Sequence, residues 1–133
     1  MPDFELKLIS PDEQYYNGNV YMVVLPGEDG DFAAMSQHMP LITYLRPGKL
    51  DIIEREDQKK SFFVSGGFVK VEQKGCLVMV DYIKSIEQLS KIEIEKEIAF
   101  LEEKSENEED KTLKGKFTYK ISILREQLEY VQQ

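Results

Sequence analysis

The sequence predicts an α+β protein, in which an antiparallel β-sandwich or flattened barrel of about eight to ten strands precedes an antiparallel helical hairpin. All five prolines and seven of the eight glycines lie before residue 87, so many turns divide the first part of the chain. Apolar residues in that part alternate or form short runs, as in half-buried strands, whereas those of the last part recur at helical spacing. We therefore divide the chain into a β domain, residues 1–86, and a hairpin, residues 87–133.

The first predicted strand contains Phe4, Leu6 and Leu8, which alternate with charged residues, and residues 20–25 form a denser, more buried strand. Further strand-like runs, each bounded by turn residues, occupy 41–45, 50–53, 62–64, 68–71 and 76–80. Cys76 lies in the last of these runs and is expected to be a small buried apolar residue.

Gly66 and Gly67 stand between two of the predicted strands. No helix follows them, so they do not form a phosphate-binding loop. Two adjacent glycines at this place predict a special turn or the close approach of another backbone, which could belong to a neighbouring chain.

The second part switches to helical periodicity. Ser85, followed three residues later by Gln88, can form a capping box and predicts a helix over about 87–105. The acidic run 105–110 is too poor in apolar groups to pack, so we expect it to connect to a second helix over about 111–130. A short connection makes the two helices an antiparallel hairpin.

Each predicted helix carries two apolar stripes. On the first helix, Leu89, Ile92 and Ala99 share a side with Phe100, and the opposite side carries Ile94, Ile98 and Leu101. We assign Leu89, Ile92 and Ala99 to the seam between the helices, where they would meet a heptad-like series on the second helix, namely Phe117, Ile121, Leu124 and Leu128. The remaining stripes would contact either the β domain or a different protein.

Composition excludes several classes of function. The net charge of −8 argues against nucleic-acid binding, which depends on clustered Lys and Arg. A single Cys and a single His provide neither a disulfide nor a zinc site, and no catalytic motif is present. We expect no metal, no cofactor and no enzymatic activity. Residues 1–5 lack the start of a secretory signal, and no apolar run approaches the roughly 20 residues of a membrane span.

Three segments in register carry a family resemblance. The run 26–32 (PGEDGDF), residues 38–41 (HMPL) with 45–50 (LRPGKL), and the run 62–82 (FFVSGGFVKVEQKGCLVMVDY) resemble the epsilon subunit of bacterial-type F-type ATP synthases. Their order and spacing agree from about Phe4 to Tyr82, and the predicted hairpin completes the two-part architecture of that family.

The resemblance implies a non-catalytic rotor subunit of the central stalk, which couples rotation of the c-ring and the gamma subunit to ATP synthesis. By position, Asp31 and His38 would contact the c-ring, although His38 taken alone is most simply an ordinary loop histidine. Candidates for the gamma contact are Leu41, Ile42, Thr43, Gly67 and Phe68. In the family the hairpin can extend towards the alpha and beta subunits and inhibit ATP hydrolysis. The implied location is the cytoplasmic face of the bacterial inner membrane, as a peripheral part of the complex.

The sequence departs from the family pattern at two places. Ala33 and Gln37 stand where members usually carry glycine, which affects the loop before His38. Some members bind ATP on the first helix through an Asp and an Arg, but the matching positions, Leu89, Ser90, Glu93 and Ile94, lack both. Because no cation is available there for a phosphate, we expect no ATP binding.

Two other classes of function remain open at this stage. The β domain could be an adaptor or chaperone-like platform, with the hairpin as a clamp for varied clients. An enzyme is compatible with the sequence only if a partner chain supplies the missing catalytic groups.

Overall fold

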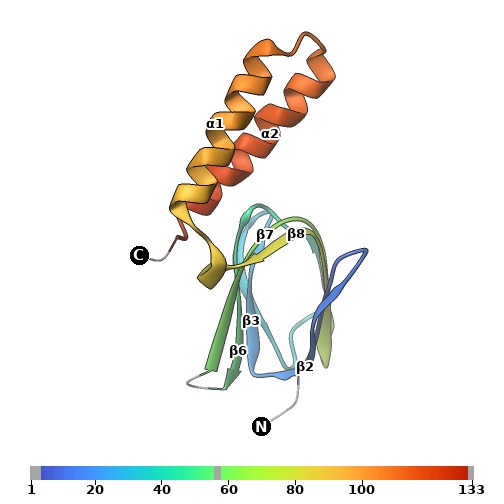
Figure 1. Ribbon diagram of the computed structural model, residues 1–133. Coiled ribbons are helices and arrows are strands. Elements are labelled where there is room, and N and C mark those ends of the chain that lie inside the picture. The colour runs from blue at the N-terminus through green and yellow to red at the C-terminus, as the bar shows by residue number, and fades with distance from the viewer. Residues whose placement is uncertain (1–3, 56–57, 132–133) are drawn as a thin grey trace. The chain divides into compact units, whose positions relative to one another are not determined.

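The computed structural model describes residues 4–55 and 58–131 and divides the chain into two compact units, Met1–Ser85 and Ile86–Gln133. The first unit, the β domain, contains strands only, and the second contains the helices (Figure 1).

Eight strands form the β domain, and the predicted fold class, a β-sandwich followed by two helices, is confirmed. Their order in the sheet is β2-β1-β8-β7-β6-β3-β4, and β5 pairs with β7 outside this path. The strands are β1 (Phe4–Ile9), β2 (Gln14–Val20), β3 (Met22–Gly27), β4 (Gly30–Met35), β5 (Leu41–Tyr44), β6 (Gly48–Arg55), β7 (Gln58–Val71) and β8 (Gly75–Ser85).

One strand pair departs from the predicted antiparallel arrangement. β1 and β8 run parallel, with Leu6 opposite Cys76 and Leu8 opposite Val78, while the other ladders between the described strands are antiparallel. Parallel neighbours need a long connection, and here the connection is almost the whole β domain. Periodicity within a strand carries no information about this direction.

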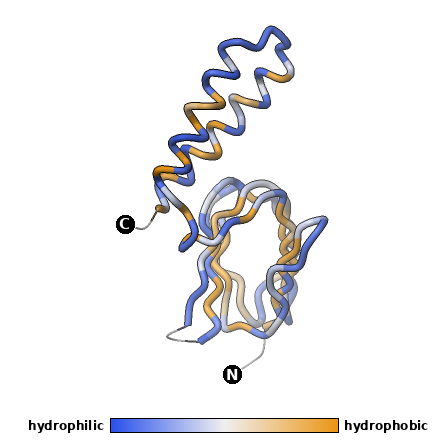
Figure 2. The backbone as a smooth tube through the Cα atoms, viewed as in Figure 1, coloured by the Kyte–Doolittle hydropathy of each residue, from blue (hydrophilic) through white to orange (hydrophobic). Residues whose placement is uncertain are grey.

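The core of the β domain is built from alternating inward side chains. In β1, Phe4, Leu6 and Leu8 are fully buried while Glu5 and Lys7 are exposed. Other strands add aliphatic side chains such as Leu50 and Val78 to this core, and Figure 2 shows the resulting hydrophobic positions along the strands. Cys76 belongs to this cluster, and burial raises the pKa of its thiol to about 12, which makes it an inert apolar residue.

The two adjacent glycines lie inside a single long strand. β7 pairs with β6 through residues 58–64 and with β5 through residues 68–71. Opposite β8 the register is unbroken, with Ser65 facing Tyr82 and Gly67 facing Val80, so Gly66 and Gly67, both with positive φ, lie where β7 changes its partner from β6 to β5. Glycines inside a strand allow a tight bend at such a corner, and Gly67 lies against the Met79 carbonyl oxygen of β8. The expected close backbone approach therefore occurs within this chain.

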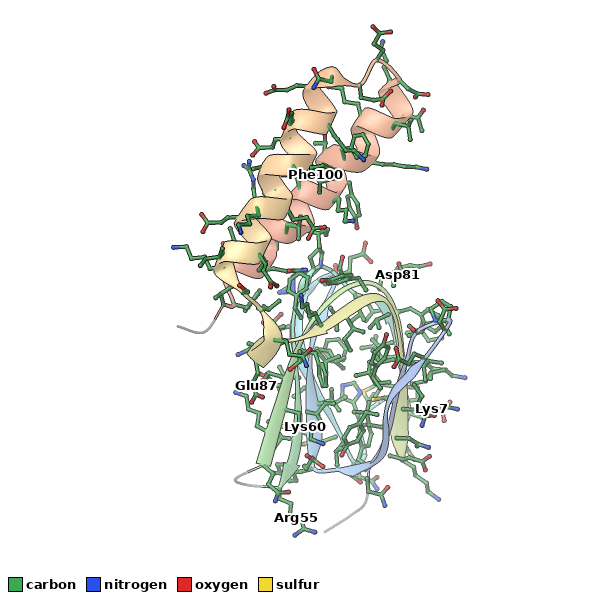
Figure 3. The ribbon with its side chains drawn as sticks, viewed as in Figure 1. Lys7, Arg55, Lys60, Asp81, Glu87 and Phe100 are labelled. Carbon is green, nitrogen blue, oxygen red and sulfur yellow. The ribbon has the colours of Figure 1, made fainter. Side chains whose placement is uncertain are left out.

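A polar contact joins β2 to β6. The Tyr16 hydroxyl donates to Glu54 Oε2 over 2.9 Å, and the Nζ atom of Lys60, labelled in Figure 3, lies 3.6 Å from Glu54 Oε1 and 5.4 Å from the centroid of the Tyr16 ring. Burial, and then the hydrogen bond to Glu54, raise the pKa of Tyr16 to about 12. The protonated phenol is therefore the form that stabilises the fold.

Tyr16→Phe is expected to lower the free energy of unfolding by about 1 kcal/mol, because it removes this hydrogen bond. The pKa of Tyr16 is higher in the folded state, about 12, than its ordinary value of about 10. The contribution of Tyr16 is thus complete below about pH 10 and is lost as the pH rises towards 12. Urea unfolding of both chains at pH 8 and pH 11 measures this, and a difference that does not shrink at pH 11 would contradict it.

The hairpin begins later than predicted. β8 continues to Ser85, a short 3-10 turn covers Ile86–Gln88, and α1 spans Lys91–Asn107. The N-cap of α1 is Ser90, whose side chain accepts from the Glu93 backbone N–H over 3.3 Å, so the predicted Ser85 cap is wrong. The second helix, α2, spans Lys111–Leu128, and Asp110 caps it by accepting from two backbone N–H groups.

The seam of the hairpin uses the other stripe of α1. Ile94, Ile98 and Leu101 are buried, whereas Ile92 is 67% exposed and Ala99 is also exposed. The assignment of Ile92 and Ala99 to the seam is therefore wrong, and Leu89, though buried, precedes the helix. On α2, Leu124 is buried, and the other residues expected in the seam, Phe117, Ile121 and Leu128, are half-buried.

Two exposed ion pairs between the helices accompany this choice of stripe. Lys120 Nζ lies 3.5 Å from Glu97 Oε1, and Arg125 donates to Glu102 Oε2 over 3.2 Å. Glu97 and Glu102 flank the Ile94, Ile98 and Leu101 stripe on its two sides. One ion pair lies on each side of the stripe that faces α2. The Ile92 stripe points outwards.

Candidate interaction surface

Strand β5 carries the most exposed apolar side chains of the β domain. Ile42 is 70% exposed, Tyr44 is 68% exposed, Met39 just before the strand is 79% exposed, and Leu41 is exposed as well. We call these four residues the β5 surface. A cluster of large apolar side chains in water, on a rigid sheet, marks a place where another protein binds.

The residues expected at the gamma contact lie together on two paired strands. β5 and β7 are antiparallel, with Thr43 opposite Val69 and Tyr44 opposite Phe68, and the Leu45 backbone N–H donates to the Gly67 carbonyl oxygen over 3.0 Å. Side chains directly opposite in such a pair share a face. Ile42 and Tyr44 thus lie beside Lys70 and Phe68 on the outer face, and the β5 surface extends onto β7.

The end of β5 is joined to the turn between β3 and β4. Arg46 donates to Asp31 Oδ1 over 2.5 Å, and its backbone N–H donates to the Pro26 carbonyl oxygen over 3.0 Å. The Glu28 backbone N–H donates to the Tyr44 carbonyl oxygen over 2.9 Å. Asp31, expected to face the c-ring, is therefore paired within the chain and tied to the strand that carries the β5 surface.

His38 has a different set of partners from Asp31. Its Nδ1 atom lies 2.6 Å from the Met39 carbonyl oxygen, to which it donates, and its ring centroid lies 6.2 Å from that of Phe32. Asp31 stands near the start of β4, and His38 follows the end of that strand by three residues. The structure therefore places the two expected c-ring residues at opposite ends of β4, each with a separate local partner.

The loop before His38 contains a left-handed residue. Gln37, which stands where the family usually has glycine, has φ of 73°, and its backbone N–H donates to the Gln73 carbonyl oxygen over 2.9 Å. A residue with a Cβ is strained in this region by about 1–2 kcal/mol. The loop keeps the backbone conformation that a glycine would adopt freely.

Gln37→Gly is expected to raise the free energy of unfolding by about 0.5–1 kcal/mol, because the relieved strain exceeds the added entropy of the unfolded chain. Ala33→Gly, the other departure from the family pattern, is the matched control. Ala33 lies within β4 and is not among the residues with positive φ, so glycine should cost about 0.5–1 kcal/mol there. Urea unfolding measures both, and a Gln37→Gly chain less stable than the parent would refute the assignment of strain.

The described residues offer little for catalysis. Within 4–55 and 58–131, no three His, Cys, Asp or Glu side chains are placed to hold a metal ion. A shifted pKa is found there for Tyr16 and Cys76, and both groups are kept protonated. Neither described helix has the length and apolar character needed to cross a membrane.

Comparison with known proteins identifies the family of this chain. A family model described as "ATP synthase, Delta/Epsilon chain, beta-sandwich domain" matches residues 3–86. The chain belongs to the ATP synthase delta/epsilon chain family. The residues matched by the family model cover the β domain, including the β5 surface and the Asp31 and His38 segments.

Relatives in the delta/epsilon family extend the likeness. The chain is 38% identical over 86 residues to the "ATP synthase epsilon chain" of Rhodospirillum rubrum, covering 65% of this chain and 64% of the relative, which is just under two thirds of that relative's length. It is 34% identical over 113 residues to the "ATP synthase epsilon chain" of Nitrobacter winogradskyi, covering 85% and 83%.

Two solved structures share the fold. One is a chain of the Euglena gracilis mitochondrial ATP synthase (OSCP/F1/c-ring), with a TM-score of 0.79, 19% identity and coverage of 97% of this chain and 81% of that one. The other is a chain of the Tetrahymena thermophila mitochondrial ATP synthase, central stalk/c-ring, with a TM-score of 0.64, 19% identity and coverage of 97% and 96%. At this identity the likeness concerns the fold alone.

Sequence reasoning missed three residues of these surfaces. Tyr44 follows Ile42 by two residues in the segment LITY, and this spacing in a strand predicts that both side chains share a face. Arg46 and Met39 belong to segments that carry the family resemblance. Arg46 matters because it pairs with Asp31, 15 residues away, and Met39 because its side chain is exposed. Neither property has a signal in the local sequence.

Proposed function

We propose that this chain is a non-catalytic central-stalk subunit of a proton-translocating F-type ATP synthase, on the cytoplasmic face of the bacterial inner membrane. The observation that carries the proposal is the β5 surface, an exposed apolar cluster on the part of the chain that matches the delta/epsilon family. The β domain would bind the gamma subunit through Leu41, Ile42 and Thr43 on β5, with Gly67 and Phe68 on β7. A rigid sheet suits a part that transmits torque.

The c-ring contact would lie at the Asp31 and His38 segments. Asp31 forms an ion pair with Arg46, which lies two residues after the end of β5. Hydrogen bonds join the same two segments through Glu28 and Pro26. A load applied at Asp31 would therefore pass through β5 to the gamma contact, which supports a coupling role for this half of the β domain.

The hairpin would be regulatory. It leaves large apolar side chains in water on both helices, namely Ile92, Phe100, Leu113 and Tyr119, and Phe100 is labelled on α1 in Figure 3. Such side chains would be covered when the hairpin extends between the alpha and beta subunits and inhibits ATP hydrolysis. The positions that match the ATP-binding pattern of some members, such as Ser90 and Glu93, supply a helix cap rather than a cation, so we propose no ATP site.

Deletion of residues 87–133 tests this division of labour. The shortened chain is expected to bind the gamma subunit with an affinity within about threefold of the full chain, since the β5 surface is intact. ATP hydrolysis by the assembled enzyme should rise, and ATP-driven proton pumping should persist. Calorimetric titration with gamma and a coupled hydrolysis and pumping assay measure the two parts.

Loss of gamma binding on deletion would contradict the assignment of the contact to the β domain, provided that circular dichroism shows the β domain to be folded. Binding of the full chain to unrelated unfolded proteins, without preference for gamma, would favour the adaptor or chaperone-like function instead.

A further inference from the structure

One edge of β5 is paired only at its C-terminal end, through a bridge between Leu45 and Gly27, in the described part of the chain. β5 forms a ladder with β7 alone. Because the Leu45 N–H donates to Gly67, and backbone groups alternate in direction along an antiparallel strand, Leu41, Thr43 and Leu45 direct their backbone groups towards β7. Ile42 and Tyr44 direct theirs to the opposite edge.

Part of that opposite edge is already used. The Tyr44 carbonyl oxygen accepts from Glu28, and the Arg46 N–H donates to Pro26. These two bonds confirm the direction inferred from Leu45. Three backbone groups without a partner among residues 4–55 and 58–131 remain at the edge, the N–H and C=O of Ile42 and the N–H of Tyr44.

This edge has only part of the usual protection against pairing, since β5 is four residues long and Pro40 precedes it. Exposed edge strands of soluble proteins commonly carry Lys, Pro, a bulge or an inward charge, which prevents another strand from adding to them. β5, with the sequence LITY, has none of these. Its unpaired backbone groups are flanked by Ile42 and Tyr44, the most exposed apolar side chains of the strand.

We propose that an extended segment of a partner protein adds to this edge of β5 as a further strand. Its backbone would pair with the N–H and C=O of Ile42 and the N–H of Tyr44, and its apolar side chains would cover those of Ile42 and Tyr44. The backbone groups of a helix are bonded internally, so a helix would not pair with the Ile42 N–H through its backbone as an added strand would. That the segment comes from the gamma subunit rests on the proposed function.

The gain in affinity from strand addition can be estimated from the hydrogen bonds formed. Each net hydrogen bond of about 0.5–1.5 kcal/mol corresponds to roughly 2- to 12-fold in affinity. Removing the Ile42 N–H should also leave a buried acceptor on the partner without a donor, which places the expected loss at tenfold or more.

Ile42→Pro in the full chain, titrated with the gamma subunit, tests the proposal against Ile42→Ala as the matched control. Proline removes an N–H that points away from β7, so the β5–β7 ladder is retained, as at edge strands in general. Alanine removes a similar part of the side chain but keeps the N–H. We expect Ile42→Pro to bind gamma at least tenfold more weakly than Ile42→Ala, and equal affinities would overturn the proposal.

Amide hydrogen exchange of the unaltered chain gives a second measurement that does not depend on the fold of a variant. In the complex with gamma, the Ile42 and Tyr44 amides should exchange at least 100-fold more slowly than in the free chain. Binding of gamma with both amides exchanging as before would overturn strand addition and leave the proposed function standing. No binding of gamma at all would overturn the proposed function and, with it, gamma as the source of the strand.

Discussion

Gly67→Ala is expected to lower the free energy of unfolding of the β domain by more than about 3 kcal/mol. A Cβ at position 67 would lie 2.9 Å from the Val80 Cα and closer still to the Met79 carbonyl oxygen, both of which are backbone atoms of the neighbouring strand. The residue also has φ of +101°, which alanine adopts only under strain. Relief would require β7 and β8 to separate at Gly67, close to where β7 passes from β6 to β5.

Two other glycines provide a graded control. At Gly66, with φ of +72°, the first atoms that a Cβ would meet belong to the Asp81 carboxylate side chain, which can move, so the loss should be smaller. At Gly18 the nearest atom is Tyr16 Cε1 at 3.7 Å, so Gly18→Ala should change stability by less than about 1 kcal/mol. Urea unfolding of the full chain measures the series, and a Gly67→Ala chain as stable as Gly18→Ala would exclude this account of Gly67.

Tyr44→Ala is expected to weaken binding to the gamma subunit by about 2 kcal/mol, or roughly 30-fold. Tyr44 stands at the end of β5, opposite Phe68 and on the same face as Ile42, and its carbonyl oxygen accepts from Glu28. Exposed tyrosines that become buried at an interface dominate binding energy because they lose little side-chain entropy. The stability of the free chain should change little, since this side chain is in water.

Tyr119→Ala is the matched control for this prediction. Tyr119 is 61% exposed, close to the value for Tyr44, but lies on α2 of the hairpin. Its replacement should leave the affinity for gamma within about threefold if the β domain alone makes the contact. Calorimetric titration of both variants with gamma measures the difference, and equal losses would move the contact away from the β5 surface.

Local sequence determined the two-part architecture of this protein. The uneven placement of Gly and Pro separates many short elements from a few long ones, and the change from alternating to helical spacing gives their type. Inward residues such as Leu6, Leu50 and Val78 were identifiable because alternation along one strand is a property of that strand. The family resemblance likewise depends on short segments such as HMPL and LRPGKL in the correct order.

Tertiary structure alone decided how these elements pair. Both stripes of α1 are apolar, and it is the Ile94 stripe that faces α2, with Glu97 and Glu102 paired to Lys120 and Arg125 across the seam. Three other features depend in the same way on residues far apart in the chain. They are the parallel pairing of β1 with β8, the ion pair between Asp31 and Arg46, and the partly unpaired edge of β5. Periodicity reports which side of an element is apolar, whereas the identity of its partner is set by the free energy of the whole packed arrangement.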